Sequence, residues 1–252
     1  MSDNVRVADR VFDIIEQLAQ SDSPMGLTEI AKGTGMSKST VHRLLSTMYS
    51  RHYVEKNPDN TYTIGHKMIE TVSYHINGLE LLTESKPFLS NLRIELNMTA
   101  HLGILDGAEV IYVEKMDLYP DPRLYTQIGL RSPAYCSSIG KCLLSCLSGN
   151  ELDEALYSCA FEKFTMNTIT HAGEFKKHLA GVRNQGWAMD NEEYKLGHRC
   201  VGAPIFDYRG DSIAAIGVSG SVNHLSDAKL DFVIKVVKTA AREISRRMGY
   251  LD

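Results

Sequence analysis

The sequence predicts a mixed α+β fold in two domains, and three observations support this prediction. Amphipathic helical patterns fill residues 7–48, and the pattern of a short β-hairpin follows them. Between residues 79 and 252, short apolar runs of strand-like composition alternate with helical patterns. Hairpin turns join some of these runs, which is typical of an antiparallel sheet flanked by helices.

Residues 27–45 read LTEIAKGTGMSKSTVHRLL, the pattern of two short helices joined by a turn. Thr28 is the expected N-cap of the first helix, and Gly33 and Gly35 are expected to end it. Ser37 is the expected N-cap of the second helix. The apolar residues of that helix fall on one face, namely Val41, Leu44, Leu45 and Met48. This layout is that of a helix-turn-helix, so the sequence predicts DNA binding.

A hairpin pattern comes directly after the second helix. Tyr53 and Val54 begin one strand, residues 57–60 (Asn-Pro-Asp-Asn) form a tight turn, and residues 61–64 return. A hairpin in this position is a wing, and an amphipathic helix over residues 7–18 precedes the pair. We therefore expect a winged helix-turn-helix DNA-binding domain over residues 1–65.

The second helix carries polar side chains opposite its apolar face. Arg43 is the candidate for a bidentate contact to guanine, whereas Lys38 and Thr40 lie in the first turn, where phosphates bind. The predicted DNA-contacting residues are Thr28, Lys38, Ser39, Thr40, His42, Arg43, Ser46 and Thr47. From periodicity alone, a helical hairpin with a solvated polar face is the alternative.

The charge distribution limits how tightly one such domain can bind DNA. Residues 1–78 carry a net charge of −1 and residues 79–252 a net charge of −3, so neither domain is basic overall. Residues 37–56 hold a local charge of +3. One patch of this size supports only a few phosphate contacts, so we expect a homodimer or homotetramer to place several copies on double-stranded operator DNA.

The composition is that of an ordinary soluble protein, and the length allows two domains or one large one. The chain has 252 residues, of which 43% are hydrophobic and 23% charged. It contains no apolar run of about 18 residues and no signal-peptide core, so we expect no membrane span and a cytoplasmic location. The five cysteines form no C-x-x-C pair and are expected to be free thiols, and no cofactor is predicted.

The remaining chain divides into a linker helix over residues 66–79 and a second domain over residues 80–252. The apolar side of the linker helix either transmits motion between the domains or simply packs, and both interpretations remain open. In the second domain the predicted helices are 79–96 (interrupted at Pro87), 139–147, 151–157, 175–183 and 227–248. The predicted strands are 99–105, 110–116, 124–128, 200–206 and 212–218.

Several motifs follow one another in a specific order. After the helix-turn-helix and TYTIG come HLGILDG, SSIGK, AMDNEEYKLGHRC, AAIGVSG and MGY. In this order they make the chain resemble IclR-type transcriptional regulators over essentially its whole length. The chain is also similar to the KdgR-like branch of these regulators, which controls sugar-acid catabolism, in the segments SKSTVHRLL and PAYCSSIGKCLL. The resemblance implies a winged helix-turn-helix followed by a GAF-like effector-binding domain. It also implies dimers or dimers of dimers that often act as repressors of carbohydrate or sugar-acid catabolic operons.

The resemblance further implies a pocket for a small organic acid in the second domain. Carried over by motif, the effector-binding residues are Leu124, Ser138, Ile139, Asp190, His198, Cys200, Gly217 and Ser219. The chemistry is plausible on its own terms, because the segment from Ser138 to Lys141 enters a helix, where free N–H groups bind a carboxylate. Asp190 can accept from a ligand hydroxyl, and Cys200 and Ser219 are weak donors.

Two of these positions depart from the family's glyoxylate-type members. Gly217 stands where relatives that bind very small keto-acids tend to have Ser, and His198 where they tend to have a small or apolar residue. Gly217 adds room, and His198 adds a donor or a charge for a second polar group. We therefore expect a sugar-derived acid rather than glyoxylate.

Other interpretations of these residues remain open. Asp190 begins an acidic run that, without the resemblance, is better explained as a solvated loop. Cys142 and Cys146 lie four residues apart on an apolar helix face and are expected to pack in the core. His198 and Cys200 suit a zinc-binding sensor or a thiol-dependent enzyme, but no second ligand pair, nucleophile elbow, phosphate loop or HExxH motif accompanies them. We therefore predict no enzymatic activity and no metal.

Overall fold

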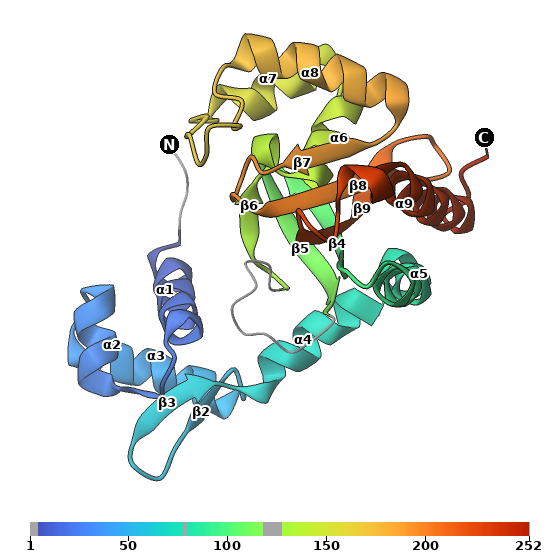
Figure 1. Cartoon of the computed structure of the whole chain (residues 1–252). Coiled ribbons are helices and arrows are strands. Elements are labelled where there is room, and N and C mark those ends of the chain that lie inside the picture. Colours follow the sequence, from blue (N-terminus) through green and yellow to red (C-terminus); the bar gives the residue numbers. More distant parts are fainter. Residues whose placement is uncertain (1–4, 78–79, 118–127, 252) are drawn as a thin grey trace. The chain divides into compact units, whose positions relative to one another are not determined.

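The computed structural model describes residues 5–77, 80–117 and 128–251. The chain divides into two compact units, residues 1–79 and residues 80–252. Figure 1 shows the elements of both units. Within the described residues, no helix has the length and apolarity needed to cross a membrane.

The N-terminal unit is the expected winged helix-turn-helix. Its elements in chain order are α1 (Arg6–Gln20), β1 (Met25–Gly26), α2 (Leu27–Thr34), α3 (Lys38–Ser50), β2 (Val54–Lys56), β3 (Thr61–Ile64) and α4 (His66–Asn77). The strands pair in the order β1-β3-β2, so a short strand that the sequence patterns do not reveal completes the wing. The three helices and the wing share one apolar core, to which Ile14, Ile30, Val41, Leu45 and Val54 contribute fully buried side chains.

The ends of the two central helices test the predicted caps. Ser37 is the N-cap of α3, and its Oγ accepts from the Thr40 N–H at 3.3 Å. The predicted Thr28 cap is wrong, because α2 begins two residues earlier, at Leu27, and Gly26 occupies the N-cap position. Glu29 Oε2 accepts from the Gly26 N–H at 2.7 Å and so stabilises this earlier start.

Only one of the two glycines predicted to end α2 does so. Gly35 is the C-cap, with a φ of +67° that other residues rarely adopt. Gly33 lies inside the helix, where an added Cβ would stand 1.8 Å from Gln17 Nε2 of α1. Gly33 is therefore explained by the close packing of α1 on α2, and the prediction that it ends the helix is wrong.

The C-terminal unit is built on one antiparallel sheet of six strands in the order β6-β5-β4-β9-β8-β7. The strands are β4 (Thr99–Asp106), β5 (Glu109–Met116), β6 (Arg131–Pro133), β7 (Ala188–Asn191), β8 (His198–Phe206) and β9 (Ser212–Ser221). The helices are α5 (Glu80–Leu96), η1 (Ala134–Cys136), α6 (Ser138–Cys146), α7 (Gly149–Tyr157), α8 (Ala172–Gln185) and α9 (Asp227–Arg247). Helix α6 packs on one face of the sheet, with α7 and α8 beyond it on the same side, and α5 and α9 cover the other face (Figure 1). This confirms the expected fold class.

Three details differ from the sequence patterns. Helix α5 continues through Pro87, so the expected interruption is wrong; packing against β4 and α9 outweighs the one backbone hydrogen bond that proline loses. Strand β7 holds Asp190 in the sheet rather than in a solvated loop. The predicted strand at 124–128 falls almost wholly outside the described residues, and Ile128 lies in the turn before β6.

Candidate functional site

The predicted DNA-contacting side chains lie on the outer face of α3 and at the start of α2. His42, Arg43 and Ser46 are exposed, as are Lys38, Ser39, Thr47 and Thr28. Thr40 is half-buried, and its Oγ1 lies 2.9 Å from Ser37 Oγ. The hydroxyl of Thr47 donates to the Arg43 carbonyl at 3.2 Å, so its proton already takes part in a hydrogen bond within the helix. The remaining exposed groups make α3 a candidate recognition helix.

The wing is tied to the start of α4. The Gly65 N–H donates to the Tyr53 carbonyl at 3.0 Å, and the Lys67 N–H donates to the His52 carbonyl at 3.2 Å. Glu55 Oε1 accepts from the His66 N–H at 3.4 Å and also contacts the His66 ring. An added Cβ at Gly65 would stand 2.3 Å from the His52 carbonyl oxygen, so this corner requires glycine. The wing and the first turn of α4 therefore form one hydrogen-bonded piece.

Seven of the eight predicted effector residues line one cavity in the C-terminal unit. The cavity has a volume of about 80 Å³ and lies between the N-terminus of α6 and the sheet. Its walls include Ser138, Ile139, Asp190, His198, Cys200, Gly217 and Ser219. The eighth residue, Leu124, lies outside the described residues. The topology thus brings together residues that are up to 81 positions apart in sequence.

The N-terminus of α6 supplies hydrogen-bond donors to this cavity. Ser137 is the N-cap, and its Oγ accepts from the Gly140 N–H at 2.9 Å. The N–H groups of Ser138 and Ile139 come before the first intrahelical hydrogen bond, so the helix itself gives them no partner. An added Cβ at Gly140 would stand 2.3 Å from the Ala134 backbone, so glycine permits η1 to pack against this turn. The result is a helix start at the cavity wall of the kind at which anions bind in proteins.

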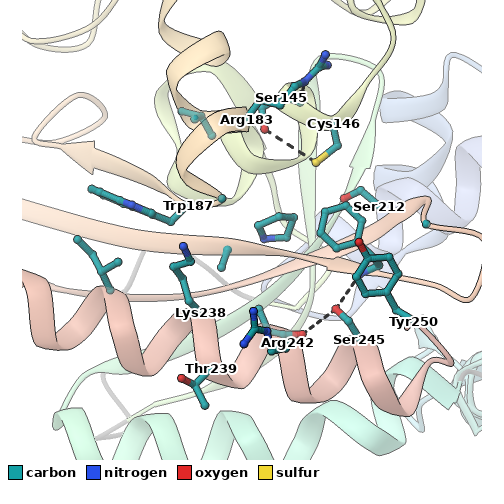
Figure 2. A pocket seen from close by; sticks show the side chains of 18 of the residues that line it. Ser145, Cys146, Arg183, Trp187, Ser212, Lys238, Thr239, Arg242, Ser245 and Tyr250 are labelled. Atoms are coloured by element: carbon teal, nitrogen blue, oxygen red, sulfur yellow. Dashed lines mark hydrogen bonds between the residues drawn. The ribbon is translucent and has the colours of Figure 1, made fainter. Parts of the chain in front are cut away.

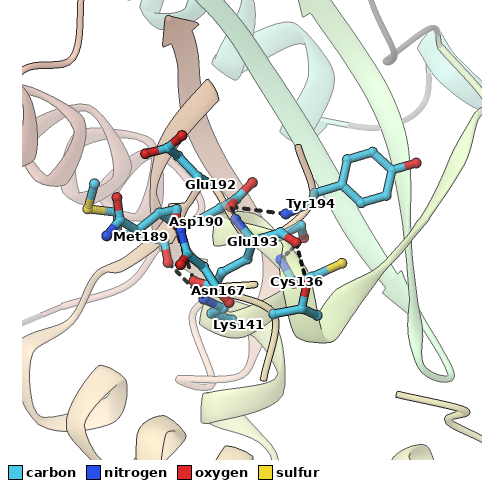
Figure 3. A network of polar contacts seen from close by, with 12 residues as sticks. Cys136, Lys141, Asn167, Met189, Asp190, Glu192, Glu193 and Tyr194 are labelled. Carbon is cyan, nitrogen blue, oxygen red and sulfur yellow. Dashed lines mark hydrogen bonds and ion pairs between the residues drawn. The ribbon is translucent and has the colours of Figure 1, made fainter. Parts of the chain in front are cut away.

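Asp190 is the acidic group of the cavity. Its side chain is 4% exposed, and its Oδ1 accepts from the Glu193 N–H at 2.7 Å and from the Tyr194 N–H at 3.4 Å (Figure 3). These hydrogen bonds favour the charged form and lower the pKa of Asp190, but burial has the larger effect and raises the pKa to about 6. Its partner across β7 and β8 is Cys200. The cavity therefore holds a carboxyl group that titrates close to neutral pH.

A buried ion pair lies behind this wall. Lys141 is 0% exposed; its Nζ pairs with Glu193 Oε1 and donates to the Met189 carbonyl at 2.8 Å (Figure 3). The Glu193 carbonyl accepts from Thr168 Oγ1 at 2.6 Å and from Thr165 Oγ1 at 3.2 Å. Because Lys141 belongs to α6 and Glu193 lies two residues after the end of β7, the pair fixes the helix start against the strand that carries Asp190.

The sequence patterns missed several residues of the cavity. These are His101, Tyr112, Ser132, Ser137, Tyr194, Lys195 and Val218. His101 stands on β4, which the strand order places next to β9, and Tyr112 stands on β5, on the other side of β4. The Ser132 hydroxyl donates to the Tyr112 hydroxyl at 3.3 Å. Lys195 is exposed, so it marks the open side of the cavity.

The chemistry of the cysteines does not favour the enzyme or zinc alternatives. Burial and the neighbouring Asp190 carboxylate raise the pKa of Cys200 well above its ordinary value, so the thiol stays protonated and is a poor nucleophile. Burial likewise raises the pKa of Cys142, whose side chain packs in the core as expected. Among the described residues, no three His, Cys, Asp or Glu side chains gather in a way that could hold a metal ion.

A second and larger groove, of about 1080 Å³, runs between α8, α9 and the sheet (Figure 2). Arg183 donates from its guanidinium to the carbonyls of Ser145 and Leu147 at the end of α6. Lys238 Nζ donates to the Gln185 carbonyl at 2.7 Å. These cations complete the C-terminal ends of neighbouring helices, which is a structural role.

The chain was compared with known families and structures. The model of the IclR helix-turn-helix domain matches residues 7–58, and that of the bacterial transcriptional regulator IclR C-terminal domain matches residues 74–246. The HTH-type transcriptional regulator KdgR of Escherichia coli (strain K12) is 34% identical over 99% of this chain and 95% of its own. XynR of the same organism, also an HTH-type transcriptional regulator, is 32% identical over 98% of both chains.

A solved structure shares the whole fold. The crystal structure of IclR from Thermotoga maritima covers 98% of this chain and 100% of its own, with a TM-score of 0.84 and 28% identity. The two family models together span both structural units, and the relatives align over nearly their full length. The chain therefore belongs to the IclR family of bacterial transcriptional regulators, on the KdgR-like branch, and joins a DNA-binding helix-turn-helix domain to a C-terminal effector domain.

Proposed function

We propose that this regulator represses a catabolic operon for sugar-derived acids and that such an acid, bound in the 80 Å³ cavity of the C-terminal domain, controls its binding to operator DNA. One observation carries the proposal: Ser138 and Ile139, which begin α6 and whose N–H groups the helix leaves without a partner, line the same cavity as the buried Asp190. Donors of this kind suit a carboxylate, and the acceptor beside them suits a hydroxyl group of the same molecule.

The roles of the side chains follow from this arrangement. The N–H groups of Ser138 and Ile139 hold the ligand carboxylate, and Asp190 accepts from a ligand hydroxyl. Cys200 and Ser219 are cross-strand partners on β8 and β9, so both can face the middle of the ligand. The bound acid joins α6 to the sheet, and Lys141 and Glu193 stiffen that junction.

The length of the ligand is argued from the open side of the cavity. The cavity volume of about 80 Å³ is small and suits the carboxylate end of an acid, while the rest of a longer molecule extends toward the open side. His198 lies two residues from Cys200 along β8 and lines the same cavity as Lys195. These polar groups suit the hydroxyl-rich end of a longer acid, which glyoxylate lacks.

The preference for longer acids can be measured by calorimetry. We expect D-gluconate or 2-keto-3-deoxy-D-gluconate to bind the full-length protein at least tenfold more tightly than glyoxylate, because only the longer acids reach His198. Cys200→Ala is the matched variant: it is expected to change the affinity, while neither protein turns the acid over. Tight binding of glyoxylate, with none of the longer acids, would contradict this ligand class.

Control of DNA binding is expected to work by linkage. The acid binds more tightly to one arrangement of the paired DNA-binding domains than to another. This difference in binding free energy, about 1–3 kcal/mol, sets how far the acid changes the affinity for DNA. A homodimer or homotetramer places several copies of the +3 patch of residues 37–56 on one DNA. A gel-shift titration with these acids, on DNA that flanks the protein's own gene, tests the proposal. The absence of a specific shift at every acid concentration would refute it.

The recognition helix gives a separate prediction. Arg43→Ala is expected to weaken binding to the operator by about 1–3 kcal/mol, with a smaller loss on unrelated DNA, if the exposed guanidinium reads a guanine. Lys229→Ala, which removes one exposed positive charge from the C-terminal domain, is the control. Fluorescence anisotropy on both DNAs provides the measurement. Equal losses on the two DNAs would show that Arg43 contacts only phosphate.

A further inference from the structure

His101 lies in the cavity but has no role in the function proposed above. We propose that its imidazole is a positioning group for ligand specificity, because His101 Nε2–H donates a hydrogen bond to Ser219 Oγ. The Ser219 hydroxyl then donates its own proton to an oxygen of the ligand that can only accept. This inference rests on the cavity being the effector site. It adds that the Ser219 side of the site selects an accepting oxygen, such as that of a carboxylate or keto group, over a group that can only donate, such as an amide N–H.

The first step is the geometry of the pair. His101 Nε2 and Ser219 Oγ are 2.8 Å apart, and both residues line the cavity. His101 is 5% exposed, and its ring also contacts the ring of Tyr112, with 5.5 Å between the ring centroids. The imidazole is therefore a buried neighbour of the Ser219 hydroxyl, and a ligand oxygen in the same cavity can meet that hydroxyl.

The second step explains why the ring can reach Ser219. His101 on β4 stands directly opposite Gly217 on β9, two residues before Ser219 on the same face of that strand. Since Gly217 has no side chain, nothing stands on β9 between the ring and the hydroxyl. An added Cβ at Gly217 would lie 2.8 Å from the Val201 carbonyl oxygen and 3.3 Å from Ile139 Cγ1. Glycine at position 217 thus permits the close approach of β8 and of Ile139 at the cavity wall.

The third step is the charge of the ring. Burial lowers the pKa of His101 to about 3, and the positive charge of Lys115 on β5 acts in the same direction. The imidazole is neutral at physiological pH, so it carries one N–H and one lone pair. It therefore adds no positive charge to the cavity and works only through the direction of its hydrogen bond.

The last step concerns the single proton of the serine hydroxyl. If Ser219 donated this proton to His101, its oxygen could only accept from the ligand, and a carboxylate or keto oxygen offers no proton. If His101 donates instead, the Ser219 hydroxyl is free to donate to such an oxygen. The second arrangement alone satisfies an acid, and it disfavours a ligand that presents a donor at this point.

The test combines affinities with the position of the ring proton. Full-length wild type, His101→Phe, His101→Gln, Ser219→Ala and the double variant His101→Phe/Ser219→Ala are titrated with D-gluconate and 2-keto-3-deoxy-D-gluconate. His101→Phe is expected to weaken binding about 5- to 20-fold, and His101→Gln, which keeps an N–H donor, to recover most of this loss. In the Ser219→Ala background, His101→Phe should change affinity less than twofold, because the group that it orients is gone.

Two controls separate positioning from folding. His224→Phe changes an exposed histidine that is not among the residues lining the cavity, and thermal unfolding is recorded for every variant. If His101→Phe weakens binding equally with and without Ser219, the residue has only a packing role and the inference is wrong. If His101→Gln binds the acids as weakly as His101→Phe does, the N–H donor is not what matters, and the inference is wrong as well.

Ring ¹⁵N resonances, assigned by their loss in His101→Gln, report the tautomer directly. The Nε2–H form is expected in the free and in the acid-bound protein, and the Nδ1–H form would overturn the inference. If no acid binds the wild type, the ligand proposal fails, and the tautomer of the free protein still decides the direction of the His101–Ser219 hydrogen bond.

Discussion

Lys141→Met is expected to lower the free energy of unfolding of the C-terminal unit by about 3–5 kcal/mol, because it leaves the carboxylate of Glu193 buried without its counter-ion. Glu193 is 6% exposed, and its Oε2 has no hydrogen-bond partner among the described residues, so the ammonium group of Lys141 is its main compensation. Methionine fills a similar volume, so the loss reports the charge rather than a cavity.

Urea unfolding gives the measurement for this variant. The chain has a single tryptophan, Trp187, which stands just before β7 and reports on the unit that contains the ion pair. The double variant Lys141→Met/Glu193→Gln is expected to recover most of the lost stability, since no unpaired charge remains. Lys177→Met, at an exposed position of α8, is the surface control. A loss below about 1 kcal/mol for Lys141→Met would show that water or a rearranged partner compensates Glu193.

Asp190→Asn is expected to weaken acid binding about 10- to 100-fold and, in the same protein, to raise the free energy of unfolding at pH 8 by about 1–3 kcal/mol. The asparagine keeps an oxygen for the N–H groups of Glu193 and Tyr194 but carries no buried charge. Its binding defect follows from the lost carboxylate acceptor. Function and stability would thus make opposite demands on this position.

The pH dependence gives the sign of the stability effect. Burial raises the pKa of Asp190 to about 6 from its ordinary value of 3.8, so the folded protein holds this proton more tightly than the unfolded chain does. The resulting stabilisation is complete below about pH 4 and is lost as the pH rises through 6. The advantage of Asp190→Asn should therefore be small at pH 5 and larger at pH 8, as measured by urea unfolding at both. An equal difference at the two pH values would contradict the raised pKa.

The parts of the fold that depend on local spacing could be predicted from sequence. The apolar positions of α3 and its Ser37 cap lie within one helix, and the hairpin signal Asp106-Gly107 joins β4 to β5. The Thr28 cap failed because a side chain three residues beyond the true cap, Glu29, moved the helix start to Gly26. Thr28 and Gly26 are both plausible N-caps, and the contact between Glu29 and the Gly26 N–H, which residue spacing does not reveal, decides between them.

The cavity shows where local reasoning ends. Ser138, Asp190 and Ser219 were reached through their motifs, yet His101 was not, because an interior strand histidine is ordinarily a packing residue. Its importance depends on the order β4-β9-β8, which pairs strands far apart in the chain. The sequence places Lys141 in a segment that leads from a loop into a helix. Only the fold shows that its ammonium group is buried against Glu193.

The hydrogen bonds that tie the wing to α4 have a mechanical consequence. Because Gly65, His66 and Lys67 are bonded back to residues 52–55, a rotation of α4 carries the wing with it instead of being absorbed at residue 65. The 12 residues of α4 make a lever about 18 Å long at 1.5 Å per residue. Tilting such a lever by about 10° moves its far end by about 3 Å, roughly the spacing of neighbouring base pairs. A modest tilt of this helix is therefore enough to take a recognition helix out of register with its half-site.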